Sequence, residues 1–131
     1  MLRQYAQVVG VILLVIGVLG IVGLFLGWWS LFGFINIDIV EDIVHLVTGG
    51  LLAYVGFGRT PAATARSIVG GLGVVFLVVG VLGFLSPMLF GLIPHSYSVL
   101  ENFVHLVIGV LSMAVAWYLP RRQGAAYAGR A

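Results

Sequence analysis

Two short segments of the chain carry carboxylates and imidazoles at a matching spacing. The first holds Asp38, Glu41 and His45, and the second repeats a glutamate and a histidine four residues apart at Glu101 and His105. Residues at i, i+3 and i+4 share one face of a helix. Ionisable groups in apolar helices usually face the interior of a bundle, because contact with lipid is expensive. We therefore expect the two imidazoles and their carboxylates to converge inside the molecule.

Convergence of two imidazoles and two carboxylates is compatible with several kinds of chemistry. The interpretation we favour is a buried, hydrogen-bonded His/Glu core that fixes how the helices pack and needs no cofactor. One alternative is a b-type haem with His45 and His105 as its axial ligands. Another is a proton or solute path through the bundle. A third is a divalent metal ion with four ligands, which would be Glu41, His45, Glu101 and His105.

The same segments also have the pattern of helix N-termini. Asp38-x-x-Glu41 and Ser98-x-x-Glu101 both resemble capping boxes, in which the two side chains satisfy free backbone N–H groups. We expect Asp38 and Ser98 to act mainly as caps.

Composition places these segments in a membrane protein. Of 131 residues, 62% are hydrophobic and 8% are charged, whereas a soluble domain devotes about a quarter of its residues to charge. There is no cysteine, which excludes disulfides, thiol catalysis and cysteine-ligated metals. The few basic residues are not a nucleic-acid footprint, and no hydrolase constellation occurs, so we expect a non-enzymatic protein.

Four apolar runs predict an all-α transmembrane four-helix bundle, because only helices satisfy the backbone of such segments in hydrocarbon. They cover residues 8–29, 43–57, 68–85 and 103–119. We expect one membrane domain over residues 1–119 and a flexible cytoplasmic tail over residues 120–131. His95 and Tyr97 fall in the loop before the fourth run, His95 in solvent and Tyr97 at the membrane interface.

Charge asymmetry predicts the orientation of the four spans. All six arginines lie at the N-terminus, between the second and third runs or in the tail, and all four acids lie toward the other side. The positive-inside rule then places both termini in the cytoplasm, in a multi-pass inner-membrane protein.

The sequence also contains an internal repeat, which indicates a duplication. Residues 41–49 match residues 101–109 at six of nine positions, and three glycines of the first run recur 63 residues later in the third. We expect repeats at about 7–58 and 67–118, which would form two tandem hairpins related by a pseudo-two-fold axis along the membrane normal. The glycine stripes favour close helix packing, with a partner or a planar cofactor as the alternative occupant. The stripes are Gly10, Gly17 and Gly20, and Gly73, Gly80 and Gly83.

The segment from Asn102 to Gly109, with His105-Leu106-x-x-Gly109 at its centre, resembles a family of small four-pass bacterial membrane proteins of unknown function. That family carries an Asn-x-x-His-Leu-x-x-Gly-like segment at the head of its second and fourth helices. The first copy here has Asp42 in place of the asparagine. The resemblance covers about residues 7–118 and implies a bacterial inner-membrane protein, with no enzyme class and no functional residues. Beyond the lipid bilayer, we expect a homo-oligomer or an accessory subunit of a larger membrane complex.

Overall fold

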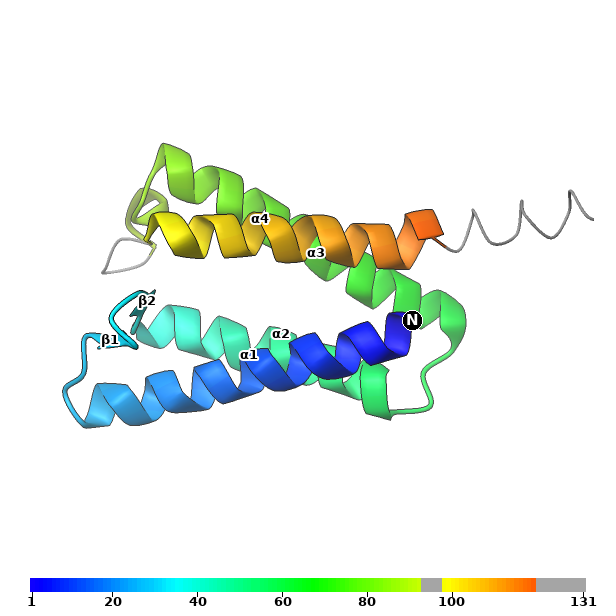
Figure 1. Cartoon of the computed structure of the whole chain (residues 1–131), viewed down its shortest axis with the longest axis horizontal. Helices are drawn as coiled ribbons and strands as arrows, with labels where there is room; N and C mark the ends of the chain where they lie inside the picture. The colour runs from blue at the N-terminus through cyan, green and yellow to red at the C-terminus, as the bar shows by residue number, and fades with distance from the viewer. Residues whose placement is uncertain (93–97, 120–131) are drawn as a thin grey trace, which may run out of the picture.

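The computed structural model describes residues 1–92 and 98–119, which form four long helices side by side (Figure 1). In chain order the helices are α1 (Leu2–Phe25), α2 (Ile39–Phe57), α3 (Ala62–Leu85) and α4 (Val99–Met113). A π-helical turn, η2 (Ala114–Tyr118), continues α4. Each of the four is long and apolar enough to cross a membrane. The predicted all-α transmembrane four-helix fold is confirmed.

The helices differ from the apolar runs at their ends. α1 begins at Leu2 and ends at Phe25, so it includes Arg3 and excludes the tryptophan pair at 28–29. It stops there because Gly27 has a φ of +73°, a left-handed conformation outside the helical range. α2 begins earlier than its apolar run, because Glu41 and Asp42 form its first turn.

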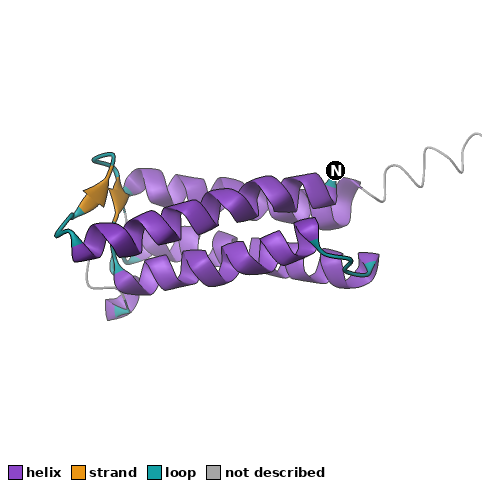
Figure 2. Ribbon diagram, turned by 90° about the horizontal axis from the view of Figure 1, so that it is seen from below, coloured by secondary structure: helices purple, strands orange, loops and turns teal. Residues whose placement is uncertain are grey.

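The connections after α1 and α3 lie at one end of the bundle, where the acids are found; we call this the acid end (Figures 1 and 2). After α1, strands β1 (Ser30–Leu31) and β2 (Ile35–Asn36) form a small antiparallel hairpin that the sequence did not predict. After α3, a short 3-10 helix, η1 (Leu89–Gly91), precedes α4. Both connections contain Leu-Phe-Gly, and both phenylalanines and both glycines are left-handed, with φ of +57° and +81° in the first copy and +58° and +87° in the second.

The opposite end, which we call the arginine end, holds the N-terminus and the connection between α2 and α3. Arg3 ties these segments together. Its guanidinium donates to the carbonyl oxygens of Val55 (2.9 Å), Gly58 and Thr60 (2.6 Å). These carbonyls lie at the end of α2 and just after it, where helix geometry leaves backbone acceptors unpaired.

Within the described residues, α1 packs mainly against α2 and α3 mainly against α4. Glycine makes the close approach in both pairs. A Cβ atom added to Gly10 would lie 2.6 Å from the backbone nitrogen of Ala53, and one added to Gly73 would lie 2.9 Å from the carbonyl oxygen of Gly109. These distances leave no room for a side chain, so the glycines serve packing inside each helix pair.

The glycines nearest the acid end meet polar side chains. A Cβ atom on Gly20 would overlap the carboxylate of Asp42, and one on Gly83 would overlap the amide of Asn102. Asp42 and Asn102 are both buried. In each helix pair, one buried polar side chain of the second helix (α2 or α4) therefore packs against a glycine of the first helix (α1 or α3).

The two helix pairs touch through an apolar core and through polar contacts near both ends. Toward the arginine end, the hydroxyl of Tyr5 on α1 lies 2.7 Å from the hydroxyl of Ser112 on α4 and donates to the Ile108 carbonyl oxygen at 3.2 Å. At the acid end, the Ser98 hydroxyl donates to the carbonyl oxygen of Phe34 at 3.2 Å. The apolar core comprises Ala6, Leu13, Leu52, Val55, Ala65, Val69, Phe76 and Ala116.

Candidate functional site

Asp38 acts as the N-cap of α2. Its carboxylate Oδ1 accepts hydrogen bonds from the backbone nitrogens of Val40 (2.8 Å) and Glu41 (3.4 Å). Asp38 is in the extended conformation expected of a cap, and its side chain is buried. The prediction that Asp38 caps this helix is confirmed.

Ser98 and Glu101 form a complete capping box at the start of α4. The Ser98 hydroxyl accepts from the Glu101 backbone nitrogen at 3.1 Å, and Glu101 Oε2 accepts from the Ser98 backbone nitrogen at 2.6 Å. Glu101 Oε1 also accepts from the backbone nitrogen of Asn36, in β2. The capping prediction for Ser98 is confirmed, and Glu101 additionally joins the two helix pairs.

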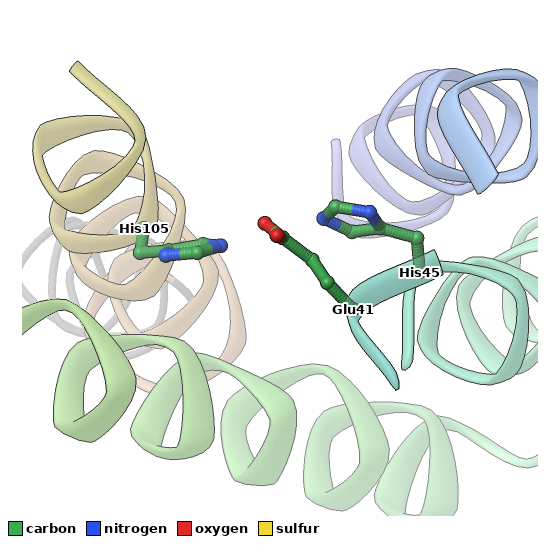
Figure 3. Close-up of side chains that lie close together, drawn as sticks. All are labelled: Glu41, His45 and His105. Atoms are coloured by element: carbon green, nitrogen blue, oxygen red, sulfur yellow. The ribbon is translucent and has the colours of Figure 1, made fainter. Parts of the chain in front are cut away.

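Glu41 occupies the same position in α2 that Glu101 occupies in α4, but it does not close a capping box. Its side chain is 2% exposed, and neither carboxylate oxygen has a hydrogen bond of good geometry. The side chain of Asn36 lies beside it. Figure 3 shows the Glu41 carboxylate directed into the space between His45 and His105.

The two imidazoles face each other across the junction of the helix pairs. The ring centroids of His45 and His105 are 6.4 Å apart, and the ring planes are inclined by 37°. His105 also stacks on Phe76 of α3, with ring centroids 5.9 Å apart and ring planes inclined by 23°. Both histidines are buried, and Nδ1 of His45 has no hydrogen-bond partner.

Three of the four predicted metal ligands thus come together. One ligand atom from each of Glu41, His45 and His105 lies within 4.8 Å of the others; we call these three residues the Glu/His/His group. Glu101 lines the same cavity, but both of its carboxylate oxygens accept backbone hydrogen bonds.

Acidic side chains are concentrated around this group. The four acids of the chain are all buried at the acid end, namely Asp38, Glu41, Asp42 and Glu101. In the part of the chain that the structure describes, the arginines are Arg3 at the start of α1, Arg59 between α2 and α3, and Arg66 near the start of α3, which are segments of the arginine end. Unpaired charge is costly to bury, so positive charge for these carboxylates has to come from the imidazoles, from bound protons or from a cation.

A cavity of about 130 Å³ reaches the group from between α1 and α4. Its polar lining consists of Glu41, His45, Glu101 and His105. The rest of the lining is apolar: Ile12, Leu13, Ile16, Phe34, Ile35, Leu100, Val104 and Ile108.

Two contributors to the site could not be anticipated. Asn36 carried no recognisable signal, because its backbone nitrogen reaches Glu101 only through the β1–β2 turn. Phe76 is one of many apolar residues in α3, and nothing in the sequence distinguishes it from the others. Its stacking on His105 depends on how the helices pack together. The predictions for His95, for Tyr97 and for the flexible tail at 120–131 lie outside the described residues.

Comparisons with family models, with curated proteins and with solved structures find no match to this chain. The resemblance to the four-pass bacterial family therefore stays a prediction. The fold and the site define the class of the protein. It is a multi-pass integral membrane protein with a buried Glu/His/His group where its helix pairs meet.

Proposed function

We propose that this membrane protein binds one divalent transition-metal ion through Glu41, His45 and His105. The observation that carries the proposal is the convergence of one carboxylate and two imidazoles, all buried, within 4.8 Å. Imidazole and carboxylate together suit zinc and its neighbours in the first transition series.

The state of the Glu41 carboxylate favours an ion over a purely structural role. A buried carboxylate normally accepts hydrogen bonds or pairs with a cation, since its desolvation is otherwise uncompensated. Beside Glu41 lies the neutral side chain of Asn36, without good hydrogen-bond geometry, and the described arginines belong to segments at the arginine end. A divalent cation would supply the missing charge.

The spacing fits an ion after a small contraction. Zinc binds imidazole nitrogen and carboxylate oxygen at about 2.0–2.2 Å, so two ligand atoms on one tetrahedral ion lie roughly 3.5 Å apart. The observed 4.8 Å limit leaves about 1 Å to close, which side-chain rotation can supply. Three protein ligands leave a fourth position open, and the cavity gives access to it.

The size of the cavity argues against haem. Its volume is about 130 Å³, whereas pockets for drug-sized molecules measure about 300–1,000 Å³. A macrocycle between His45 and His105 would require the helix pairs to separate.

A conducting path has less support. Thr48, one turn beyond His45, donates to the carbonyl oxygen of Val44 in its own helix at 2.7 Å. The Ser112 hydroxyl is hydrogen-bonded to the hydroxyl of Tyr5. These hydroxyls are engaged in local contacts, and they do not extend the polar group toward the arginine end.

A second candidate is a structural or accessory module in which the same group holds the helix pairs together. The polar contacts between the pairs, Asn36 with Glu101 and Tyr5 with Ser112, favour it. The two candidates are compatible, because an ion bound by α2 and α4 would itself clamp the pairs.

We further propose that the chain arose by duplication and that the arginine end faces the cytoplasm of a bacterial inner membrane. The matched glycine contacts and the two left-handed Leu-Phe-Gly turns support the duplication. The separation of arginines from acids supports the orientation. Under this proposal the two helix pairs are the two predicted repeats.

Metal uptake tests the central proposal. Detergent-purified protein, stripped with a chelator and then dialysed against zinc, should retain about one zinc ion per chain by mass spectrometry. His105→Ala and Glu41→Gln should each lose this zinc, while Thr48→Val, which removes a nearby buried hydroxyl, should retain it. A wild-type chain that takes up no zinc would refute the proposal.

A further inference from the structure

The cavity that reaches the Glu/His/His group has walls from two helices of different pairs. Ile12 and Ile16 of α1 form one side, and Leu100 and Val104 of α4 form the other. α1 and α4 touch near the arginine end, where Tyr5 bonds to α4. The space between them therefore lies in the half of the bundle that contains the group.

The mouth of the cavity lies on the lipid-facing surface. Ile12 is 50% exposed and Val104 is 45% exposed, although both line the cavity. Both residues belong to membrane-spanning helices, so their exposed surface faces hydrocarbon in the membrane. A molecule entering here would come from the lipid phase.

The lining restricts the chemistry of such a molecule. Apolar walls select an apolar body, and a few polar groups at the base fix its orientation, as in most small-molecule sites. With a divalent ion bound, the two glutamates at the base, Glu41 and Glu101, balance its charge, so the site has no excess positive charge to attract an anionic head group. An uncharged oxygen, in a carbonyl or a hydroxyl, suits the open coordination position of a metal ion.

We propose that the cavity admits a neutral, lipid-soluble molecule whose carbonyl or hydroxyl oxygen is directed at the Glu/His/His group. This proposal rests on the proposed metal site, because the oxygen would occupy the free position on the ion. A volume of about 130 Å³ accommodates a head group and the first part of a chain. The remaining chain would leave between α1 and α4 into the bilayer.

A photoreactive long-chain alcohol tests the proposal. Zinc-loaded protein in phosphatidylcholine nanodiscs is irradiated with decanol that carries a diazirine near its hydroxyl group, and the adducts are mapped by mass spectrometry. We expect adducts concentrated on residues 12–16 of α1 and 100–108 of α4, and we expect unlabelled decanol to compete them away.

A matched pair of variants separates the cavity from the general lipid surface. Val104→Phe fills the mouth and should lower cavity labelling about ten-fold, because overpacking displaces the ligand. Val107→Phe makes the same change on the same helix at a residue that is 54% exposed and does not line the cavity. It should label like the wild type. The zinc content of both variants should equal that of the wild type.

The outcomes distinguish this proposal from the metal site. Labelling spread evenly over lipid-facing residues, or lowered equally by both variants, would overturn access through the cavity while the measured zinc content leaves the metal site standing. Undiminished cavity labelling of zinc-free His105→Ala would overturn the role of the ion in holding the alcohol. If the wild-type chain binds no zinc, the proposed function is refuted, and this inference, which rests on it, is refuted as well.

Discussion

The Glu41 carboxylate of α2 and the His105 imidazole of α4 contribute atoms within 4.8 Å of each other, although they belong to different helix pairs. Glu101, at the corresponding position of α4, instead bonds to the backbone of Ser98 and Asn36. Two glutamates at matching helix positions thus make different contacts. Glu101 caps the start of α4, whereas the Glu41 carboxylate is directed at the two imidazoles.

This difference gives opposite expectations for Glu41→Gln with and without metal. In zinc, the variant should bind the ion at least about ten-fold more weakly, because a neutral amide replaces an anionic ligand. In a chelator, it should be more stable than the wild type by about 1 kcal/mol, because it buries no unpaired charge. Denaturant titration in detergent, with and without zinc, measures both effects. A metal-free variant less stable than the wild type would contradict this account of Glu41.

Glu101→Gln should behave differently. It weakens the capping box and the contact with Asn36, and we expect it to lower the stability of metal-free protein by about 1 kcal/mol. Zinc stoichiometry should stay at the wild-type value, because Glu101 is not in the proposed ligand set. Loss of zinc from a folded Glu101→Gln protein would show that Glu101 is a metal ligand and would contradict the proposed ligand set.

The close helix contacts predict strong effects of small substitutions. A Cβ atom at Gly20 or Gly83 would overlap the side chain of Asp42 or Asn102, so Gly20→Ala and Gly83→Ala should each destabilise the protein by about 1–3 kcal/mol. Gly50→Ala is the control, since a Cβ atom there meets no other atom within 4 Å. Equal stability of all three variants in a denaturant titration would show that the helix pairs do not pack this closely.

The hydroxyl contact between Tyr5 and Ser112 should couple the helix pairs. We expect Tyr5→Phe and Ser112→Ala each to cost about 1 kcal/mol, and the double variant to cost less than their sum, because both remove the hydrogen bond that joins the two hydroxyls. A double-mutant cycle in detergent measures this coupling. Strict additivity would mean that the contact contributes nothing to stability.

Orientation can be tested with single cysteines, because the chain has none of its own. Met88→Cys at the acid end should react with a membrane-impermeant maleimide added to intact cells whose outer membrane is permeabilised. Ala63→Cys at the arginine end should react only after the inner membrane is opened, as the positive-inside rule requires. The reverse pattern would invert the proposed topology.

The helices and the facing histidines could be predicted because they depend on local patterns. Long apolar runs have to be helical in hydrocarbon, and the i, i+4 spacing of Glu41 and His45 puts both on one helix face. Their burial follows from the cost of exposing them to lipid. For these residues, local sequence and the membrane are sufficient.

The separate roles of Glu41 and Glu101 could not be predicted, because they depend on a distant contact. Both glutamates sit three residues after a capping residue. Glu101 closes its capping box and also accepts from the Asn36 backbone nitrogen, which the β1–β2 turn brings to it, whereas Glu41 does neither. The end of α1 was also missed, because the sequence does not show which of the many glycines adopts the left-handed conformation seen at Gly27.

The most direct test of the central claim is X-ray absorption spectroscopy of zinc-loaded protein. The account predicts nitrogen and oxygen neighbours only, at about 2.0–2.2 Å, with outer-shell scattering from two imidazoles. His105→Ala, which should not retain zinc, should give no such spectrum. A wild-type chain that binds no zinc, or a spectrum without imidazole scattering, would contradict the account.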